Sequence, residues 1–349
     1  MTIKTLLITL TLVSLTTISF QSNAKFAGKN LILVHGLKVD DFKNRPTDAQ
    51  LPGLAESYWS EYWGNRAEAK LYWPATARIT GRVKDLIRAQ IKDLEARGTC
   101  AAGCVFLTHS AGDLVTRDAL TRLRQWGVDP NRFKVLATLD LAGAGGGSEL
   151  ANLAINVSDG GGIISSIQRR IVKLFTGINP SRGTLGTVYD LRPSNARSIG
   201  RTNTGTPRLR FVGTGAAYLG VSRPFVKGND DGVVGVHSTC GASSARSYDS
   251  CSRSVRDNGV LRSTSGPSSF MSNHYPILMG SSTDHFEIIT NKRTGNYTTV
   301  TNGRTLGGIR LDFSTKTKRK WWALWRKVRQ VKNGDRKSMS ANIYDTLNR

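Results

Sequence analysis

The sequence has 349 residues and a formal net charge of +24 at pH 7. This length is enough for one large α/β domain or two small ones, and a chain this long can bury a core without relying on disulfides. So large a positive charge is unusual for a soluble metabolic enzyme, and it attracts anionic membranes, acidic polysaccharide, lipopolysaccharide or nucleic acid. The alternative is that the charge serves only solubility.

Residues 1–24 have the pattern of a secretory signal peptide. Lys4 provides a positive start, 6–20 form an apolar stretch, and Ser22-Asn23-Ala24 offers small residues where cleavage requires them. The apolar stretch is too short and too rich in Thr and Ser for a transmembrane helix, and it has no cysteine for a lipoprotein anchor. We therefore expect an exported protein, secreted or periplasmic. Its mature chain would carry +23, one less than the whole chain because only Lys4 is lost.

Apolar runs and helical periodicity alternate along the chain that follows. Short apolar runs predict strands at 30–34, 68–73, 105–109, 133–141 and 209–213. Apolar residues at helical spacing predict helices over 83–94 and 114–126. Strands that alternate with amphipathic helices predict a parallel, right-handed α/β sheet with its site at the carboxyl ends of the strands. A polar loop, 38–66, separates the first two strands, and its aromatic side chains are expected to pack onto the domain rather than line a pocket.

The stretch around Ser110 is the centre of the functional prediction. An apolar run ends at Ser110 and a helical pattern begins directly after it, with the small residues Ala111 and Gly112 at the bend. A turn this sharp presents the serine hydroxyl at the top of a sheet, which is how a nucleophile is displayed. The alternative is a serine that merely caps a helix. Thr108 stands where the usual G-x-S-x-G pattern has its first glycine.

The region after the 133–141 strand contains a glycine-rich turn and a basic segment. The turn, 143–147, lacks the spacing and the acidic partner of a dinucleotide site, so we expect no cofactor. Within the basic segment 154–204, residues 163–174 place apolar side chains on one helical face and cations on the other. This segment is either a lid-like insertion over the site or an ordinary surface helix packed on the core.

The four cysteines form two close pairs. Cys100 lies near Cys104, and Cys240 lies near Cys251. An even number of cysteines in an exported protein predicts two local disulfides. Neither pair has a further His or Cys at metal-ligand spacing, so a zinc site is not expected.

A nucleophilic serine needs a base and an acid that orients the base. Of the five histidines, His285 is preferred as the base because an apolar run follows it and can fix its loop, and His274 is the alternative. Asp231, in a glycine-containing turn after a late strand, competes with Asp140 for the role of the acid. Either choice preserves the order Ser, Asp, His along the chain.

The C-terminal segment 301–349 is basic and contains tryptophans. Between 316 and 332, cations surround Trp321, Trp322 and Trp325, and on a helix the aromatic and aliphatic residues would share one face. That is the composition of an interfacial membrane helix, which anionic lipid would attract. The competing interpretations are a helix docked on the domain and a nucleic-acid patch. Nucleic-acid binding is disfavoured because the sequence has no recognition motif for it.

Five short motifs together resemble the α/β-hydrolase fold, and more narrowly the secreted bacterial triacylglycerol lipases. They are Leu33-Val34-His35-Gly36-Leu37, Thr108-His109-Ser110-Ala111-Gly112, Gly147-Ser148-Glu149-Leu150-Ala151, Asp231-Gly232-Val233-Val234-Gly235 and Asp284-His285-Phe286. The likeness extends in pieces from about 30 to 291, with 154–225 poorly matched. It implies Ser110 as nucleophile, Asp231 as acid and His285 as base. It also implies an oxyanion hole made by the backbone N–H groups of Leu37 and Ala111. Leu-Asp140-Leu-Ala resembles the acid position of vertebrate lipases, which keeps Asp140 open.

The sequence therefore predicts an exported serine carboxylester hydrolase of lipase, phospholipase or esterase type. Residues 25–300 would form its α/β-hydrolase domain and 301–349 a basic extension. The expected partners are an ester or lipid substrate and an anionic membrane or envelope surface, and the chain is expected to be a monomer. The alternative is an inactive hydrolase-like cationic protein that binds envelope, lipopolysaccharide or other polyanions.

Overall fold

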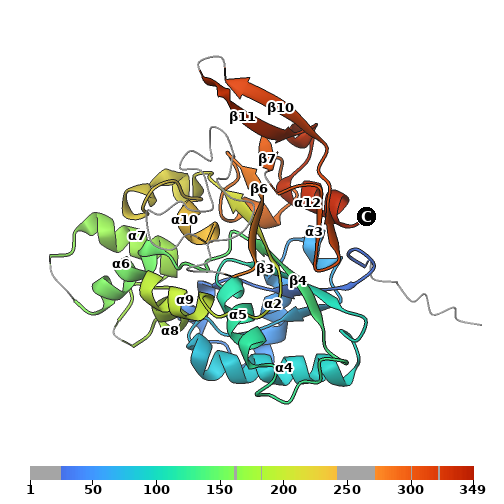
Figure 1. The fold of residues 1–349 in the computed structure, drawn as a ribbon. Helices are drawn as coiled ribbons and strands as arrows, with labels where there is room; N and C mark the ends of the chain where they lie inside the picture. Colours follow the sequence, from blue (N-terminus) through green and yellow to red (C-terminus); the bar gives the residue numbers. More distant parts are fainter. Residues whose placement is uncertain (1–24, 161–162, 182, 242–271, 300, 321–322) are drawn as a thin grey trace, which may run out of the picture.

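The computed structural model describes residues 25–160, 163–181, 183–241, 272–299, 301–320 and 323–349. Within these ranges, nine strands form one sheet in the order β10-β11-β7-β6-β5-β4-β3-β1-β2, and β8 and β9 form a separate small hairpin (Figure 1). The predicted signal peptide, 1–24, lies outside the described residues. No helix in the described part of the chain has both the length and the hydropathy that crossing a bilayer requires.

The central strands of the sheet are parallel. Their bounds are β1 Asn30–Val34, β2 Ala69–Leu71, β3 Cys104–His109, β4 Val135–Leu141, β5 Arg208–Gly213 and β6 His274–Gly280. Each neighbouring pair from β2 to β6 runs in the same direction. The predicted α/β class, with a mostly parallel sheet flanked by helices, is confirmed. All five predicted strands are present, whereas β6 was not predicted.

Three antiparallel strands extend the sheet beyond β6. They are β7 Tyr297–Thr299, β10 Thr315–Lys320 and β11 Ala323–Val331. β11 pairs with β7 at Gln330 and Thr298, and with β10 along most of its length. The separate hairpin consists of β8 Arg304–Leu306 and β9 Ile309–Leu311. The C-terminal segment thus joins the same sheet as the strands that precede it.

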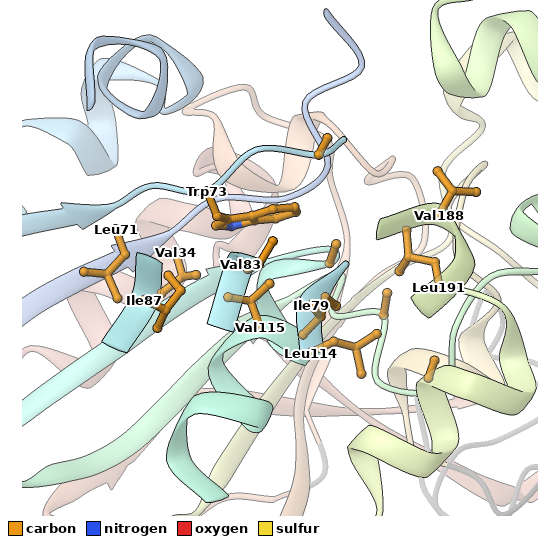
Figure 2. Packing of buried hydrophobic residues seen from close by; sticks show 14 of the residues in the cluster. Val34, Leu71, Trp73, Ile79, Val83, Ile87, Leu114, Val115, Val188 and Leu191 are labelled. Atoms are coloured by element: carbon orange, nitrogen blue, oxygen red, sulfur yellow. The ribbon is translucent and has the colours of Figure 1, made fainter. Parts of the chain in front are cut away.

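The larger core lies between one face of the sheet and most of the helices. These helices are α4 Lys84–Ala96, α5 Gly112–Arg122, α6 Glu149–Ser158, α7 Ser166–Thr176, α8 Gly186–Asp190 and α9 Pro193–Gly200. Because side chains alternate along a strand, Ile32 and Val34 of β1 face this core. Figure 2 shows Trp73 and Val83 packed beside Val34 in the same cluster. The predicted helices over 83–94 and 114–126 are confirmed as α4 and α5, although α5 begins and ends earlier than expected.

A second core covers the opposite face. Leu31 and Leu33 of β1 point into it, and helix α12, Met339–Leu347, contributes Met339, Ile343 and Leu347. Trp59 and Trp63 also belong to this core, and both are buried. They come from the loop between β1 and β2, which carries the short helices α1 Asp40–Asn44, α2 Leu51–Tyr58 and α3 Glu61–Gly64. Packing of these tryptophans onto the domain agrees with the expectation for this loop.

The helix predicted over the basic C-terminal segment is wrong. The segment forms the β10–β11 hairpin, which extends beyond the rest of the sheet in Figure 1. The physical reason is a period of two in the second strand, where Lys327 and Arg329 are exposed while Val328 and Gln330 are buried. A helix could not bury those two positions together and still pair with β7. Trp321 and Trp322, on which the helical interpretation relied, lie outside the described residues.

Candidate active site

Ser110 occupies a strained turn between β3 and α5. Its φ is +54°, in the left-handed region that residues with a side chain seldom adopt. Two hydrogen bonds hold the turn: the N–H of Ser110 donates to the Leu141 carbonyl at 3.1 Å, and its own carbonyl accepts from the N–H of Ala144 at 3.0 Å. A Cβ on Gly112 would overlap the carbonyl oxygens of Val34 and His35, so only glycine fits there. The strand–serine–helix turn predicted from the sequence is therefore present.

Ser110, His285 and Asp231 lie in one hydrogen-bonded line. The distance from Ser110 Oγ to His285 Nε2 is 2.9 Å, and the distance from His285 Nδ1 to Asp231 Oδ2 is 2.8 Å. All three residues are buried. Because an ionised carboxylate can only accept, the proton between His285 and Asp231 belongs to Nδ1. Nε2 is then free to accept the serine proton.

The carboxylate of Asp231 is fixed by its own turn. Its second oxygen, Oδ1, accepts the N–H groups of Val233 at 3.0 Å and Val234 at 2.7 Å. The carbonyl of Asp231 accepts the N–H of His285 at 3.0 Å, so the acid also holds the loop that carries the base. Gly232 has a φ of +96° and no room for a Cβ against Ala217. The glycine of the Asp-Gly-Val-Val-Gly motif thus permits the turn that aims Asp231.

Leu37 and Ala111, the predicted oxyanion-hole residues, are both neighbours of the serine. Leu37 lines the same pocket as Ser110, and Ala111 is its chain neighbour, at the start of α5. A Cβ on Gly36 would lie 2.8 Å from the Cβ of Ser110, so glycine brings this loop against the serine. Among the hydrogen bonds of the described residues, none is donated by the backbone N–H of Leu37 or Ala111.

Asp140, the alternative acid, lies in a different cluster. It accepts hydrogen bonds from Thr108 Oγ1 at 2.8 Å, Thr138 Oγ1 at 2.9 Å and the Arg210 guanidinium at 3.0 Å. The structure thus brings Asp231, and not Asp140, to His285. It also explains Thr108, the unusual residue of the serine motif, whose hydroxyl is a partner of the Asp140 carboxylate. Thr108 and Asp140 are direct cross-strand neighbours in β3 and β4.

Two arginines and two aspartates form a buried charge cluster beneath the serine turn. Arg210 contacts both Asp113 and Asp140, and Arg208 pairs with Asp113. All four side chains are at most 2% exposed. Arg210 also donates to the carbonyls of Gly143 at 3.1 Å and Thr239 at 2.8 Å. Since Asp113 belongs to the first turn of α5 and Gly143 opens the turn that holds Ser110, this cluster fixes the backbone on both sides of the serine.

His274, the alternative base, is placed far along the sheet from Ser110. It begins β6 and pairs with Arg208 at the beginning of β5, whereas Ser110 follows the end of β3. Because these strands are parallel, their beginnings lie at the opposite edge of the sheet from their ends. The structure therefore brings His285 to the serine and leaves His274 at the other edge.

The pocket at the serine contains residues that the sequence did not single out. It has a mostly apolar lining: Leu37, Val39, Tyr58, Ser110, Ala144, Ser148, Phe175, Leu191, Tyr218, Val233, Val234, His285 and Phe286. Phe175 comes from α7, inside the segment predicted as a lid or a surface helix. Tyr58 comes from the 38–66 loop. One aromatic residue of that loop therefore lines the pocket, whereas all of them were expected to pack onto the domain. The only signal for Tyr58 was that cluster of aromatic residues.

The predicted disulfide between Cys100 and Cys104 is confirmed, with a Cα–Cα distance of 5.0 Å. It lies at the start of β3, at the edge of the sheet opposite Ser110. The second predicted pair cannot be described in full, because Cys251 lies outside the described residues. In the part of the chain that the structure covers, no three His, Cys, Asp or Glu side chains gather as metal ligands.

Buried histidines make the folded state sensitive to acid. Burial lowers the pKa of His35 to about 3. Burial also holds the pKa of His109 well below its usual range, with a further contribution from His285, and that of His274, with contributions from Arg210 and Arg208. Histidines of the unfolded chain titrate near pH 6.5, so below that pH the unfolded chain binds more protons than the folded one. The stability that these neutral rings contribute is therefore lost as the pH falls from above 6.5.

We expect the free energy of unfolding to decrease by about 2–3 kcal/mol between pH 7.5 and 5.5. Each buried histidine contributes about 1.4 kcal/mol over this interval. Asp230 acts in the opposite direction, because burial raises its pKa to about 6 and the folded state takes up a proton there. Burial raises the pKa of Asp41 in the same sense. Urea unfolding at the two pH values measures the difference, and equal stability at both would contradict the expectation.

The arrangement as a whole is that of an α/β-hydrolase. A mostly parallel sheet carries a strand–serine–helix turn at its carboxyl edge, and the acid and base residues follow the serine in the order Asp231, His285. A hydroxyl, an imidazole and a carboxylate in one line can transfer an acyl group.

The chain matches no protein-family model and no curated protein. Among solved structures, it is similar to the mature lipase BlEst2 of Bacillus licheniformis, at 14% identity and a TM-score of 0.44, over 75% of this chain and 86% of that one. It is similar to the lipase of Staphylococcus hyicus at 12% identity and a TM-score of 0.41, over 77% of this chain and 90% of that one. Phospholipase PlaB of Legionella pneumophila matches at 17% identity and a TM-score of 0.38, over 60% of this chain and 45% of its own length.

Proposed function

We propose that this chain, an α/β-hydrolase by fold, is a serine hydrolase that cleaves carboxylic esters with apolar acyl groups, as lipases, phospholipases and esterases do. The observation that carries the proposal is the line from Ser110 through His285 to Asp231, with hydrogen bonds of 2.9 and 2.8 Å. The apolar lining of the pocket beside Ser110 supports an apolar acyl group as the part of the substrate that binds there.

In the first half of the reaction, Ser110 Oγ attacks the carbonyl carbon of the ester and its proton passes to His285 Nε2. Asp231 stabilises the imidazolium that forms. The backbone N–H groups of Leu37 and Ala111 donate to the negative oxygen of the tetrahedral intermediate, and each such donor contributes about 3 kcal/mol to transition-state stabilisation. The intermediate collapses when the bond to the alcohol oxygen breaks, and His285 gives its proton to the departing alcohol. An acyl-enzyme on Ser110 remains.

In the second half, water replaces the alcohol. His285 takes a proton from the water as its oxygen attacks the acyl carbon, and the same two N–H groups stabilise the second oxyanion. The bond between the acyl carbon and Ser110 Oγ then breaks, and the serine recovers its proton from His285. The products are a carboxylic acid and the original enzyme, and no step uses a cofactor.

The segment 154–204 supplies the features that a lid requires. Phe175 of α7 lines the pocket, and Ile171 and Val172 are buried beside it. On the same segment, Ile163, Ile167 and Leu174 are exposed, with Ile167 at 63%. Exposed side chains of this size favour contact with an apolar surface. We infer that the segment contacts lipid when the substrate is an aggregate.

Positive charge would bring the enzyme to such a surface if the lipid is anionic. Among the side chains described in the β10–β11 hairpin, the exposed cations are Lys316, Lys318, Arg319, Lys327 and Arg329. No carboxylate lies within ion-pair distance of any of them in the described part of the chain. Each such cation contributes roughly 1 kcal/mol near an anionic bilayer. An anionic membrane or envelope surface is therefore the proposed partner, and a signal peptide in 1–24 would deliver the chain outside the cytoplasm.

Labelling with a fluorophosphonate tests the proposed chemistry directly. This probe reacts with a serine only where a neighbouring base activates it. We expect one adduct, on Ser110, in the wild-type chain and in the control variant Ser57→Ala, and no adduct in Ser110→Ala. A folded wild-type chain that takes no label would contradict the proposal. It would leave the inactive cationic binding protein as the remaining candidate.

Binding to vesicles tests the proposed partner. We expect the triple variant Arg319→Gln, Lys327→Gln, Arg329→Gln to bind phosphatidylglycerol vesicles about 100-fold more weakly than wild type, since three charges contribute about 3 kcal/mol. The matched control removes three exposed cations elsewhere, by Arg88→Gln, Arg124→Gln and Lys134→Gln. Equal weakening by both triple variants would show that net charge, and not the hairpin, attracts the surface. Neutral phosphatidylcholine vesicles provide the baseline.

A further inference from the structure

Tyr58 and His109 form a hydrogen-bonded pair that the reaction described above does not use. The distance from Tyr58 Oη to His109 Nδ1 is 2.5 Å. The other ring nitrogen, His109 Nε2, lies 2.8 Å from the carbonyl oxygen of His285. His109 is 1% exposed, directly precedes Ser110, and has its ring centroid 4.8 Å from that of His285. This polar pair thus connects the 38–66 loop to the backbone of His285.

The partners of His109 determine its protonation. A carbonyl oxygen can only accept a hydrogen bond, so Nε2 of His109 must carry a hydrogen and donate it to His285. Burial and the nearby His285 hold the pKa of His109 well below its usual range, so the ring is neutral and Nδ1 has no hydrogen. Tyr58 Oη therefore donates to Nδ1. Burial raises the pKa of Tyr58, which keeps the phenol protonated and able to donate.

Tyr58 also contacts the loop that carries Leu37. A Cβ on Gly36 would overlap Tyr58 Oη, so the backbone of Gly36 packs closely against that oxygen. A Cβ on Gly36 would also lie 2.8 Å from the Cβ of Ser110. Close packing of Gly36 on Tyr58, followed by the hydrogen bonds from Tyr58 to His109 and from His109 to the carbonyl of His285, therefore forms one connected path. It joins the loop on the oxyanion side of the serine to the loop on its base side.

We propose that Tyr58 and His109 are positioning residues. They fix the distance between the loop that carries Gly36 and Leu37 and the side chain of His285, so that both reach the carbonyl group of the same bound ester. The proposal rests on the proposed function of Ser110.

A second consequence of this arrangement concerns the charge of His109. His285 becomes cationic in the transition state, and a neutral His109 beside it adds no repulsion. Burial keeps His109 neutral, and the Tyr58 hydroxyl occupies its Nδ1.

The variant Tyr58→Phe removes the hydroxyl and keeps the ring, which packs against Trp59 and His35. We expect kcat on a p-nitrophenyl ester to fall by about 10- to 100-fold with KM within threefold, because positioning acts on the transition state. His109→Gln should lower kcat to a similar degree. Tyr62→Phe, on the same loop but packed against Trp63 and Tyr344, is the matched control and should behave as wild type.

Unchanged kcat in both Tyr58→Phe and His109→Gln would overturn the proposal. So would a fall in kcat that matches the loss of folded protein in each variant. A measurement that does not need turnover is the ¹⁵N spectrum of the His109 ring, which should show hydrogen on Nε2 alone in wild type. Hydrogen on Nδ1 would also overturn the proposal. A wild-type chain with neither turnover nor fluorophosphonate labelling, but with the expected His109 spectrum, would reject the proposed function and retain the hydrogen-bond assignment.

Discussion

Replacing Ser110 with alanine is expected to reduce kcat on a p-nitrophenyl ester by about 10⁴- to 10⁶-fold. The alanine removes the proposed nucleophile but leaves the pocket, the proposed oxyanion donors and the His285–Asp231 pair in place. Because these remaining groups still bind substrate, KM should change little. The turn itself should survive, since alanine takes the φ of +54° at a strain similar to that of serine. Steady-state kinetics with purified wild type and variant measure the ratio.

The control for this experiment is Ser57→Ala, which removes a hydroxyl from an exposed position that bonds only the Leu54 carbonyl. Its kcat should equal that of wild type. Turnover by Ser110→Ala within tenfold of wild type would refute the acyl-enzyme mechanism. In that case a water molecule activated by His285 would have to attack the ester directly.

Replacing Arg210 with methionine is expected to destabilise the fold by about 3–5 kcal/mol. The change leaves the carboxylates of Asp113 and Asp140 buried with fewer partners, and an uncompensated buried charge is costly. It also removes the donors to the carbonyls of Gly143 and Thr239. The midpoint of urea unfolding should fall, and ester hydrolysis should decline at temperatures where the variant remains folded, because the turn at Ser110 loses its support.

The matched control is Arg82→Met, which breaks an ion pair with Asp48 at the surface. Both side chains of that pair are more than half exposed, so the pair is worth at most about 1 kcal/mol. Equal loss of stability in the two variants would show that the buried cluster carries no special weight. A double change of Arg210 to methionine and Asp140 to asparagine should recover part of the loss, since one of the two stranded charges is removed.

The elements that depend on local sequence were predictable. The Ser110 turn follows from an apolar run, a serine and Gly112, and the Asp231 turn from a glycine beside an acid. Both signals lie within a few residues of the side chain concerned. The choice of His285 over His274 was also accessible, because an apolar run after His285 could anchor its loop. Strands that alternate with helices predicted the α/β class, and five short motifs together, rather than any one of them, resembled the α/β-hydrolase fold.

Features that depend on strand register were not predictable. Asp140 could not be rejected as the acid because its partners, Thr108 and Arg210, become its neighbours only when β3, β4 and β5 align. Thr108, Asp140 and Arg210 are neighbours across these three strands. Their contacts explain why the Asp140 carboxylate already has hydrogen-bond partners and why position 108 is a threonine rather than a glycine. The contact between Tyr58 and His109 was not predictable for a related reason, since 51 residues separate the two along the chain.

The basic hairpin shows a different limit. Its composition fits both a helix and a pair of strands, and the alternation over 327–330 covers only four positions, too few to separate the two from the sequence. Pairing with β7 decides the outcome, because Gln330 meets Thr298 at the edge that β6 and β7 already form. A neighbour in space thus determines the secondary structure of this segment.

The position of β10 at the end of the nine-stranded sheet has a consequence for the behaviour of the protein in solution. One side of this strand pairs with β11, and its other side leaves backbone N–H and C=O groups unpaired in the part of the chain described. A second molecule could dock there edge to edge, but its own Lys316, Lys318 and Arg319 would then meet the same cations. We expect mutual repulsion to keep the molecules apart at low ionic strength. At 1 M salt, where the Debye length shrinks to about 3 Å, that protection disappears and the molecules should begin to associate through this strand.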